Sequence, residues 1–248
     1  AFAKTWADKK GVYMKTVLHK ADTRGHADHG WLNAWHSFSF AGYHDPSRIH
    51  FGALRVLNDD TVAGGMGFGA HPHDNMEIIT IPLSGQLEHR DSMGNTGIIS
   101  KGEVQVMSAG TGIQHSEKNK NSKEPLKLLQ IWVFPDKKNV EPRYDQKAFD
   151  LDKAKNSLLN IVSPMGSAGG LNIHQHAWFH LGKLDKDFSV VYELKAKENG
   201  VYAFLIDGEV TINGEKLHRR DGIGISGTDK LEIKADAESE ILLMEVPV

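Results

Sequence analysis

Two histidines in the segment GFGAHPHDNMEI, residues 67–78, are separated by a single proline. Residues i and i+2 of an extended strand point to the same side, so His71 and His73 are expected to face one space while Pro72 faces away. Proline has no amide hydrogen for a sheet ladder, which favours the end or edge of a strand. A buried neutral imidazole needs a partner for each ring nitrogen, and a metal ion can supply one. The pair therefore predicts a metal site, or two unrelated histidines if the segment lies on the surface.

His115 and Glu117 repeat this spacing in the segment SAGTGIQHSEKN. If the two strands are neighbours inside one barrel, three imidazole nitrogens and one carboxylate oxygen converge. Such a set suits a divalent first-row transition metal. An octahedral ion held by four ligands keeps about two positions open, as metal catalysis requires.

The composition limits the classes of function. The 248 residues allow one large β domain or two smaller ones of about 110 residues each. Because there is no cysteine, a metal has to be held by histidine and carboxylate. The net charge is −3 without blocks of one sign, so direct nucleic-acid binding is not expected. No apolar run approaches the ~18 residues of a spanning helix, and no signal-peptide core begins the chain, so a cytoplasmic protein without a membrane segment is expected.

The order of motifs predicts an all-β chain in two halves. The 25 glycines and the short apolar segments between turn signals favour β-strands. The sequences SMGN and INGE predict hairpin turns, and residues 126–134 predict a strand buried on both faces. The segment LSGQLEH at residues 83–89 is similar to IDGEVTI at residues 206–212. Each half is therefore expected to form a small jelly-roll barrel.

Two longer segments carry a family resemblance. GMGFGAHPHDNMEIITIPLSG and GEVQVMSAGTGIQHSEKN look like the two cupin motifs. The combination of HPH, MEIITIPLSG, EHRDSMGN and MSAGTGIQHSE is more specific. It resembles the pirin family, particularly the bacterial pirin-like proteins with quercetin 2,3-dioxygenase activity. This resemblance runs from about Met14 to the C-terminus and implies a bicupin fold.

The resemblance also implies how the chain is divided. Residues 14–135 are expected to form a metal-binding cupin barrel, and residues 136–160 a crossover with one short helix near residues 151–159. Residues 161–248 are expected to form a second cupin-like barrel without metal ligands. Residues 1–13 precede the match and are expected to be an N-terminal extension, native or added, that the fold prediction leaves out.

The implied function is metal-dependent cleavage of flavonols such as quercetin with O2, by a monomer. The family's ligands fall on His71, His73, His115 and Glu117, and the metal implied is Fe(II), although Zn, Mn, Co, Ni and Cu suit the same ligands. Glu117 is also expected to act as the general base for the flavonol hydroxyl, once desolvation raises its pKa. The alternative is a non-enzymatic metal-sensing or redox-sensing regulator that acts through protein partners.

Other residues are open to more than one interpretation. If the strand continues in phase from His73, Glu77 also faces inward, as a ligand or as a neighbour of the ligands. His174 and His176 are expected to be a surface or domain-contact pair, because no carboxylate follows them at strand spacing. Five further residues are candidates for a cavity lining, although core packing is the alternative: His36, Phe68, Met93, Trp132 and Phe134.

Overall fold

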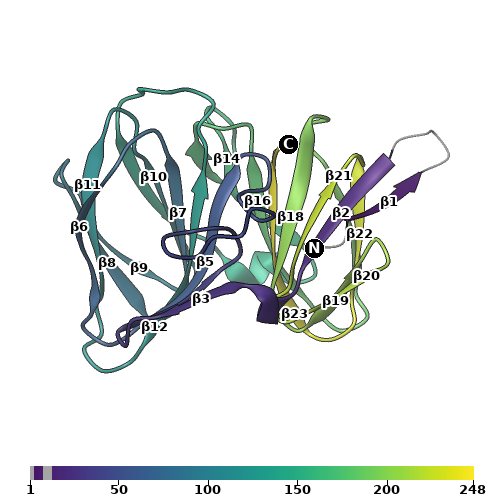
Figure 1. The fold of residues 1–248 in the computed structure, drawn as a ribbon, viewed down its shortest axis with the longest axis horizontal. Helices are drawn as coiled ribbons and strands as arrows, with labels where there is room; N and C mark the ends of the chain where they lie inside the picture. The colour runs from purple at the N-terminus through teal and green to yellow at the C-terminus, as the bar shows by residue number, and fades with distance from the viewer. Residues whose placement is uncertain (1–2, 8–12) are drawn as a thin grey trace.

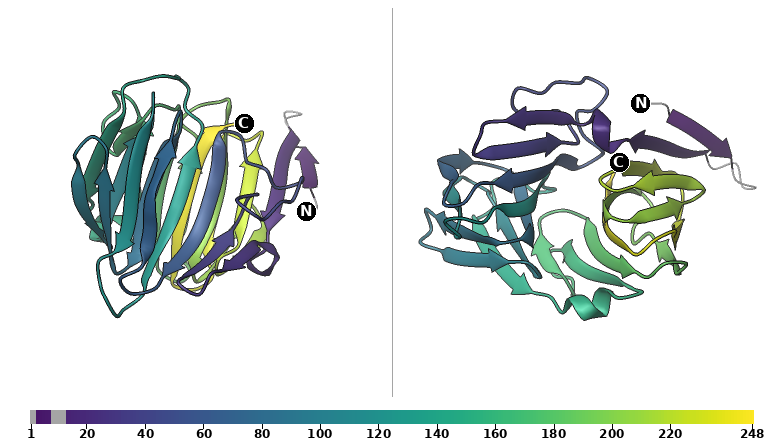
Figure 2. Two further views of the ribbon diagram at one scale, coloured as in Figure 1. Left: turned by 60° about the vertical axis from the view of Figure 1, so that its left-hand side comes forward. Right: turned by 90° about the horizontal axis from the view of Figure 1, so that it is seen from below.

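The structure is a computed structural model that describes residues 3–7 and 13–248. It has two halves, and in each half a larger β-sheet faces a four-stranded sheet (Figure 1). The two halves lie side by side with their larger sheets toward each other (Figure 2). The prediction of an all-β fold in two barrels is therefore confirmed.

The N-terminal barrel contains the segments that carry His71 and His115. Its larger sheet has the order β13-β10-β7-β12-β5-β4-β3, and its smaller sheet the order β6-β11-β8-β9. The bounds are β3 Gly25–Asp28, β4 Leu32–His36, β5 Leu54–Val62, β6 Gly67–His73, β7 Glu77–Ser84, β8 Gln86–Asp91, β9 Thr96–Ser100, β10 Glu103–Ser108, β11 Ile113–Asn119, β12 Leu126–Val133 and β13 Arg143–Ala148.

The C-terminal barrel repeats this plan with the sheet orders β1-β2-β21-β18-β23-β16-β14-β15 and β17-β22-β19-β20. The bounds are β1 Ala3–Ala7, β2 Tyr13–His19, β14 Leu158–Pro164, β15 Leu171–Ile173, β16 Trp178–Leu184, β17 Ser189–Glu193, β18 Asn199–Asp207, β19 Glu209–Ile212, β20 Glu215–His218, β21 Gly222–Ser226, β22 Lys230–Ala235 and β23 Ser239–Pro247. Two 3-10 helices, η1 Ala21–Thr23 and η2 Leu151–Ala154, lie in the connections.

The first two strands belong to the C-terminal barrel. The expectation that the N-terminal barrel starts at residue 14 is therefore wrong for β2. Strand β2 pairs antiparallel with β21, and β1 pairs with β2 (Figure 1). This pairing gives hydrogen-bond partners to an edge of β21 that would otherwise lie open. Residues 1–2 and 8–12 of the expected extension lie outside the described residues.

The expected crossover also contains more regular structure than the sequence predicts. Strand β13 pairs with β10 and completes the edge of the N-terminal sheet. The expected helix near residues 151–159 is the short η2, because β14 already begins at Leu158.

The largest hydrophobic cluster joins the two barrels. It contains Ile79 and Leu129 from the N-terminal sheet and Phe179, Phe204 and Met244 from the C-terminal sheet. Strand alternation sends the neighbours of these residues into the interior of their own barrel. The two halves are therefore packed as one body over an apolar contact.

The interiors of the two barrels differ in polarity. The C-terminal barrel is filled by a cluster of buried, mainly aliphatic side chains. In the N-terminal barrel a row of buried polar residues crosses five neighbouring strands, because each lies opposite the next: Gln105, Thr80, Gln130, Asn58 and His36. Among the described residues, the groups of side chains that could hold an ion lie in this barrel.

Glycines at equivalent bends explain the internal similarity seen in the sequence. Gly85 separates β7 from β8, and Gly208 separates β18 from β19, with φ of +80° and +89°. At both points the chain passes from the larger to the smaller sheet of its barrel. The predicted turn INGE is also present, with positive φ at Asn213 and Gly214 between β19 and β20.

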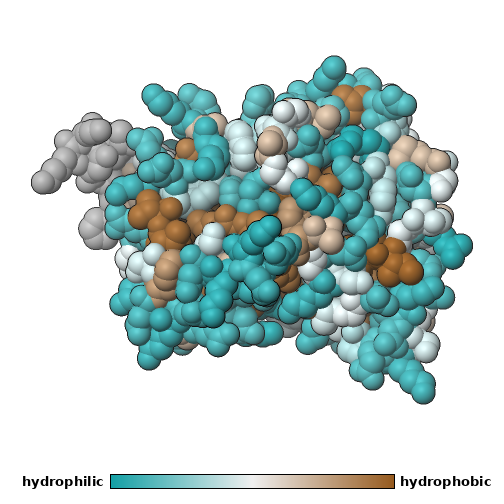
Figure 3. Space-filling model, turned by 180° about the vertical axis from the view of Figure 1, so that it is seen from behind, coloured by the Kyte–Doolittle hydropathy of each residue, from teal (hydrophilic) through white to brown (hydrophobic). Residues whose placement is uncertain are grey.

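Exposed apolar side chains are scattered over the surface. In the view from behind, hydrophobic patches are separated by hydrophilic residues (Figure 3). Such isolated apolar residues are normal on a protein surface. Within the described ranges, no helix has the length and apolar character needed to cross a membrane.

Replacing Gly208 with alanine should destabilise the fold more than replacing Gly214. Both residues have positive φ, but an added Cβ at Gly208 would overlap the carbonyl oxygen of Glu238, whereas Gly214 has open space. The free energy of unfolding should fall by about 1–2 kcal/mol in Gly214→Ala. A further loss of about 1–3 kcal/mol is expected in Gly208→Ala. Urea unfolding measures both, and equal losses would contradict the steric argument.

Candidate metal centre

Strand β11 lies between β6 and β8 in the small sheet of the N-terminal barrel. His115 on β11 is opposite His71 on one side and Asp91 on the other, and Glu117 is opposite His89. Residues that are directly opposite in a sheet point to the same face. The strand pairing therefore gathers histidines and carboxylates on the inner face of one sheet.

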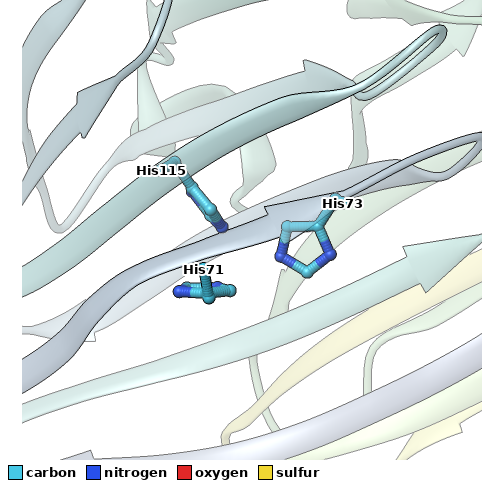
Figure 4. Close-up of side chains that lie close together, drawn as sticks. All are labelled: His71, His73 and His115. Carbon is cyan, nitrogen blue, oxygen red and sulfur yellow. The ribbon is translucent and has the colours of Figure 1, made fainter.

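Three imidazoles form the outer part of this group. His71 and His73 extend from one strand and His115 from its neighbour, and the rings lie close together (Figure 4). The ring centroids are 4.4 Å apart for His71 and His115, and 4.9 Å apart for the other two pairs. One nitrogen of each ring lies within 4.8 Å of the other two, which is close enough to hold one metal ion.

The free ring nitrogens fit a metal. Nδ1 of His71 donates to the carbonyl oxygen of Gly69 at 2.8 Å, which leaves Nε2 with a lone pair. Nε2 of His73 and both nitrogens of His115 are buried without a hydrogen-bond partner. Burial and the neighbouring His71 lower the pKa of His73 to about 4 and that of His115 to about 3. These two rings are therefore neutral near pH 7, as metal ligands must be.

Glu117 lies deeper in the barrel than His71 and His73. Its carboxylate accepts a hydrogen bond from Nε2 of Gln130 at 2.8 Å. Thr80 donates to Oε1 of Gln130 at 2.8 Å and lies 3.5 Å from the other carboxylate oxygen of Glu117. Burial raises its pKa, while the bond from Gln130 acts in the opposite direction. The structure groups Glu117 with His115 but not with His71 and His73. The register of β6 shifts between the partners of His115 and Glu117, which places Glu117 opposite Phe68.

His89 is a potential ligand that the sequence analysis missed. It is fully buried on β8, and one of its nitrogens lies within 4.8 Å of the ligand atoms of His115 and Glu117. The signal in the sequence was the spacing His-x-Asp in EHRDSMGN, which repeats the i, i+2 pattern of the other strands. In the sequence this segment predicts a hairpin turn and supports the family resemblance, and neither use assigns a role to His89.

Glu77 does not face the imidazoles. The prediction that side chains alternate without interruption from His73 to Glu77 is therefore wrong. Between β6 and β7 the chain bends at Asn75, which has φ +43°, and the alternation of side chains starts again at β7. The Glu77 carboxylate accepts a hydrogen bond from Ser108 at 2.7 Å and another from the backbone of His174. Glu77 therefore joins the two barrels.

A pocket of about 790 Å³ opens onto His71 and His73. Apolar side chains on its wall include Met76, Ile113 and Trp132, and the polar ones include Ser92, Asp74, Thr111 and Gln114. Trp132 stacks edge-on against His73, with ring centroids 4.9 Å apart. This volume lies within the range of about 300–1,000 Å³ that is usual for small-molecule sites.

The remaining candidates lie elsewhere. Phe68 and Phe134 do not line this pocket, and Met93 is exposed at the tip of the predicted SMGN turn. His36 is buried against Asn58, with 2.9 Å between Nδ1 and Oδ1. His174 lies at the contact between the halves, where its backbone carbonyl accepts from the N–H of Asp136, whereas the His176 side chain is exposed and its carbonyl accepts from Asn199 of its own barrel. The pair is therefore one domain-contact residue and one surface residue.

Comparison with protein families gives two matches. Residues 17–133 match the family model described as Pirin, and residues 160–246 match the model described as Quercetinase C-terminal cupin domain. A quercetin 2,3-dioxygenase of Escherichia coli K12 is 47% identical over 93% of this chain and 98% of its own length. A putative quercetin 2,3-dioxygenase of Pseudomonas aeruginosa is 42% identical over 91% of this chain and 97% of its own.

Solved structures give the same result for the fold. The E. coli protein YhhW superposes with a TM-score of 0.89 at 46% identity, and covers 94% of this chain and 97% of its own. A second structure, the bacterial pirin YhhW in complex with nickel(II), has a TM-score of 0.88 at 45% identity, over 94% and 99% of the two chains. These likenesses confirm the expected bicupin architecture.

Replacing Glu77 with glutamine should change how stability depends on pH. Burial raises the pKa of Glu77 to about 7 in the folded protein, against 4.5 for an ordinary glutamate. Between these values the folded state binds more protons than the unfolded state, so stability is lost as the pH rises. Glutamine does not titrate, and Glu77→Gln should gain up to about 3 kcal/mol relative to the native residue between pH 4.5 and 7.

Urea unfolding of the metal-free proteins across this pH range measures the difference. A difference that does not vary with pH would contradict the buried, protonated state of Glu77. As a control, Glu77→Gln should bind as much metal as the unchanged protein, because Glu77 faces the other barrel.

Proposed function

This chain belongs to the pirin family, and we propose that it is a metal-dependent dioxygenase that cleaves flavonols such as quercetin with O2. The observation that carries the proposal is the pocket of about 790 Å³ whose inner end is formed by His71 and His73. A flavonol has about 22 heavy atoms, which a pocket of this size accommodates. The names of the curated relatives support the same reaction.

His71, His73 and His115 hold the metal in this proposal, and Glu117 completes the set. The three imidazoles fit because their free nitrogens converge and are otherwise unpartnered. Glu117 supplies the negative charge that a divalent cation in a buried site requires. The bound metal supplies a Lewis acid with open coordination positions.

The walls of the pocket bind and orient the substrate. Trp132 and Met76 offer apolar surface to a flat aromatic ring system. Ser92, Thr111 and Gln114 offer hydroxyl and amide groups to the substrate's hydroxyls. In this proposal the flavonol binds with its reactive hydroxyl toward His71 and His73, because these two lining residues are also ligands of the metal.

Glu117 is the proposed general base. It lies beside His115 and does not line the pocket, so in this proposal it can take a proton only from a flavonol hydroxyl that reaches between the imidazoles. Burial raises the pKa of this carboxylate while no ion is bound to it, so in this proposal Glu117 acts as the base when it has left the metal. Gln130 and Thr80 hold the carboxylate in place.

Fe(II) as the native metal, a monomeric state and a cytoplasmic location complete the proposal. The ligand types accept several divalent metals, so the choice of iron follows the family resemblance. The nickel(II) complex of a bacterial pirin supports a divalent metal in general. Metal analysis of the purified protein and light scattering in solution test the first two statements.

A regulator that acts through protein partners is the less favoured function. Such a protein needs only contact between the metal and the solvent. The pocket beside the imidazoles is larger than that contact requires, and the curated relatives are named as dioxygenases.

Replacing His115 with alanine should abolish flavonol cleavage. The ring centroid of His115 lies 4.4 Å from that of His71 and 4.9 Å from that of His73. Its removal takes one of the three imidazole ligands from the metal site. Oxygen uptake and loss of flavonol absorbance, measured together after reconstitution with Fe(II), give the rate. His218→Ala, at an exposed position in the C-terminal barrel, is the matched control and should keep full turnover. Unchanged turnover in His115→Ala would place the reaction elsewhere.

Replacing Glu117 with glutamine tests the base. Glutamine keeps the size and one oxygen but cannot accept the proton. Turnover at saturating metal should fall by about 10²–10⁴-fold. Bound metal is counted in the same samples, so that loss of metal is separated from loss of the base. Full turnover with full metal content would remove Glu117 from the catalytic role.

A further inference from the structure

A second set of donor atoms lies behind the three imidazoles. It consists of His89, His115 and Glu117, whose ligand atoms all lie within 4.8 Å of one another. All three side chains are buried, with exposed fractions of 0%, 1% and 2%. Two imidazole nitrogens and one carboxylate oxygen form a donor set that Fe(II) and Zn²⁺ both use in proteins.

His89 is held in the orientation of a metal ligand. Its Nε2 donates to the carboxylate of Asp91 at 3.2 Å, and its ring stacks on Tyr144 with centroids 4.6 Å apart. Nδ1 is therefore the atom with the free lone pair, and it is buried without any partner. An imidazole that donates one N–H to a carboxylate and presents the other nitrogen is the usual arrangement of a metal-binding histidine.

Asp91 is fixed in turn by the hairpin between β8 and β9. Its Oδ1 accepts hydrogen bonds from the backbone N–H groups of Met93 and Asn95, both at 3.0 Å. The Asp91 carboxylate therefore cannot move with His89 unless these hydrogen bonds of the turn break. The backbone of the hairpin thus fixes Asp91, and Asp91 fixes the orientation of the His89 ring.

His180 shows that a buried histidine alone is not such a site. It lies in the C-terminal barrel, and its Nδ1 also has no partner. Its neighbours are Tyr192 and Asn160. Among the described residues, the groups that could hold a metal include His89 but not His180.

We propose that the N-terminal barrel offers a divalent metal ion a second, inner position, held by His89, His115 and Glu117. The inference rests on the metal site of the proposed function and extends it. His115 and Glu117 belong to both donor sets, so one ion occupies either the outer or the inner position. His71 and His73 line the pocket and belong only to the outer set, so an ion in the inner position is withdrawn from the substrate.

The test removes the outer ligands and leaves the inner ones. In the variant His71→Ala/His73→Ala the inner donor set is complete, and Co(II) is the probe. Visible d–d absorption reports binding, and competition with a chelator gives the affinity. The double variant should bind one Co(II) per chain, more weakly than the unchanged protein.

Adding His89→Gln to the double variant should weaken Co(II) binding beyond the roughly 10–100-fold that loss of an outer-shell partner costs. The matched control adds His180→Gln instead and should leave the affinity of the double variant unchanged. Circular dichroism of the metal-free proteins checks that each variant folds. If His89→Gln does not fold, Asp91→Asn replaces it, because asparagine keeps an oxygen for the turn but loses the charge that orients His89; a loss of about 10–100-fold is then expected.

Two results would overturn the inner position. One is a folded double variant that binds no Co(II) while the unchanged protein binds one equivalent. The other is an affinity of the double variant that neither His89→Gln nor Asp91→Asn changes. Either result can occur in a protein that cleaves flavonols, so the inner position can fail alone. Inner binding without flavonol turnover by the unchanged protein would support the inner position and contradict only the proposed function.

Discussion

The pairing of β11 with both β6 and β8 is the constraint on which the metal centre depends. It sets His115 opposite His71, and Glu117 opposite His89. A slip of one residue in either ladder would send β11 side chains to the outer face, because alternation has a period of two. The close approach also needs Gly67, where an added Cβ would overlap the backbone carbonyl of Glu117. Hydrogen bonds of the backbone therefore position the chemistry.

The two barrels have the same plan but different roles. The C-terminal barrel contributes mainly to stability, and the N-terminal barrel holds the candidate metal centre. The C-terminal barrel and the contact between barrels hold the large apolar clusters, which supply most of the hydrophobic free energy. The N-terminal barrel contains buried polar atoms without partners, and each such group costs about 1–3 kcal/mol. A bound ion would satisfy several of these atoms at once. The polar interior is therefore tolerable because the rest of the chain is well packed.

Local features could be predicted from the sequence, but long-range ones could not. Strand alternation predicted that His71 and His73 share a face, and turn residues predicted the hairpins. The prediction for Glu77 failed because a single residue with positive φ, Asn75, broke the alternation. The pairing of β2 with β21 joins segments about two hundred residues apart, and no local pattern encodes it. His89 was missed because its partner Asp91 also accepts hydrogen bonds from the backbone of the hairpin turn. A turn alone therefore accounts for the sequence EHRDSMGN, without a metal.

The charge inside the N-terminal barrel couples metal binding to protons. Glu117 is buried, and Asp60 is buried near it, with its pKa raised to about 8 by burial and by the charges of Asp59 and Glu117. Two carboxyl groups in one buried space favour protonation, because burial disfavours their charged forms and Glu117 raises the pKa of Asp60 further. A divalent ion held by Glu117 would favour the charged carboxylate, so metal binding would be accompanied by release of a proton. Burial raises the pKa of Glu117, and a bound ion would lower it. The depth of Glu117 in the barrel therefore decides how well the same carboxylate can serve both as a ligand and as a base.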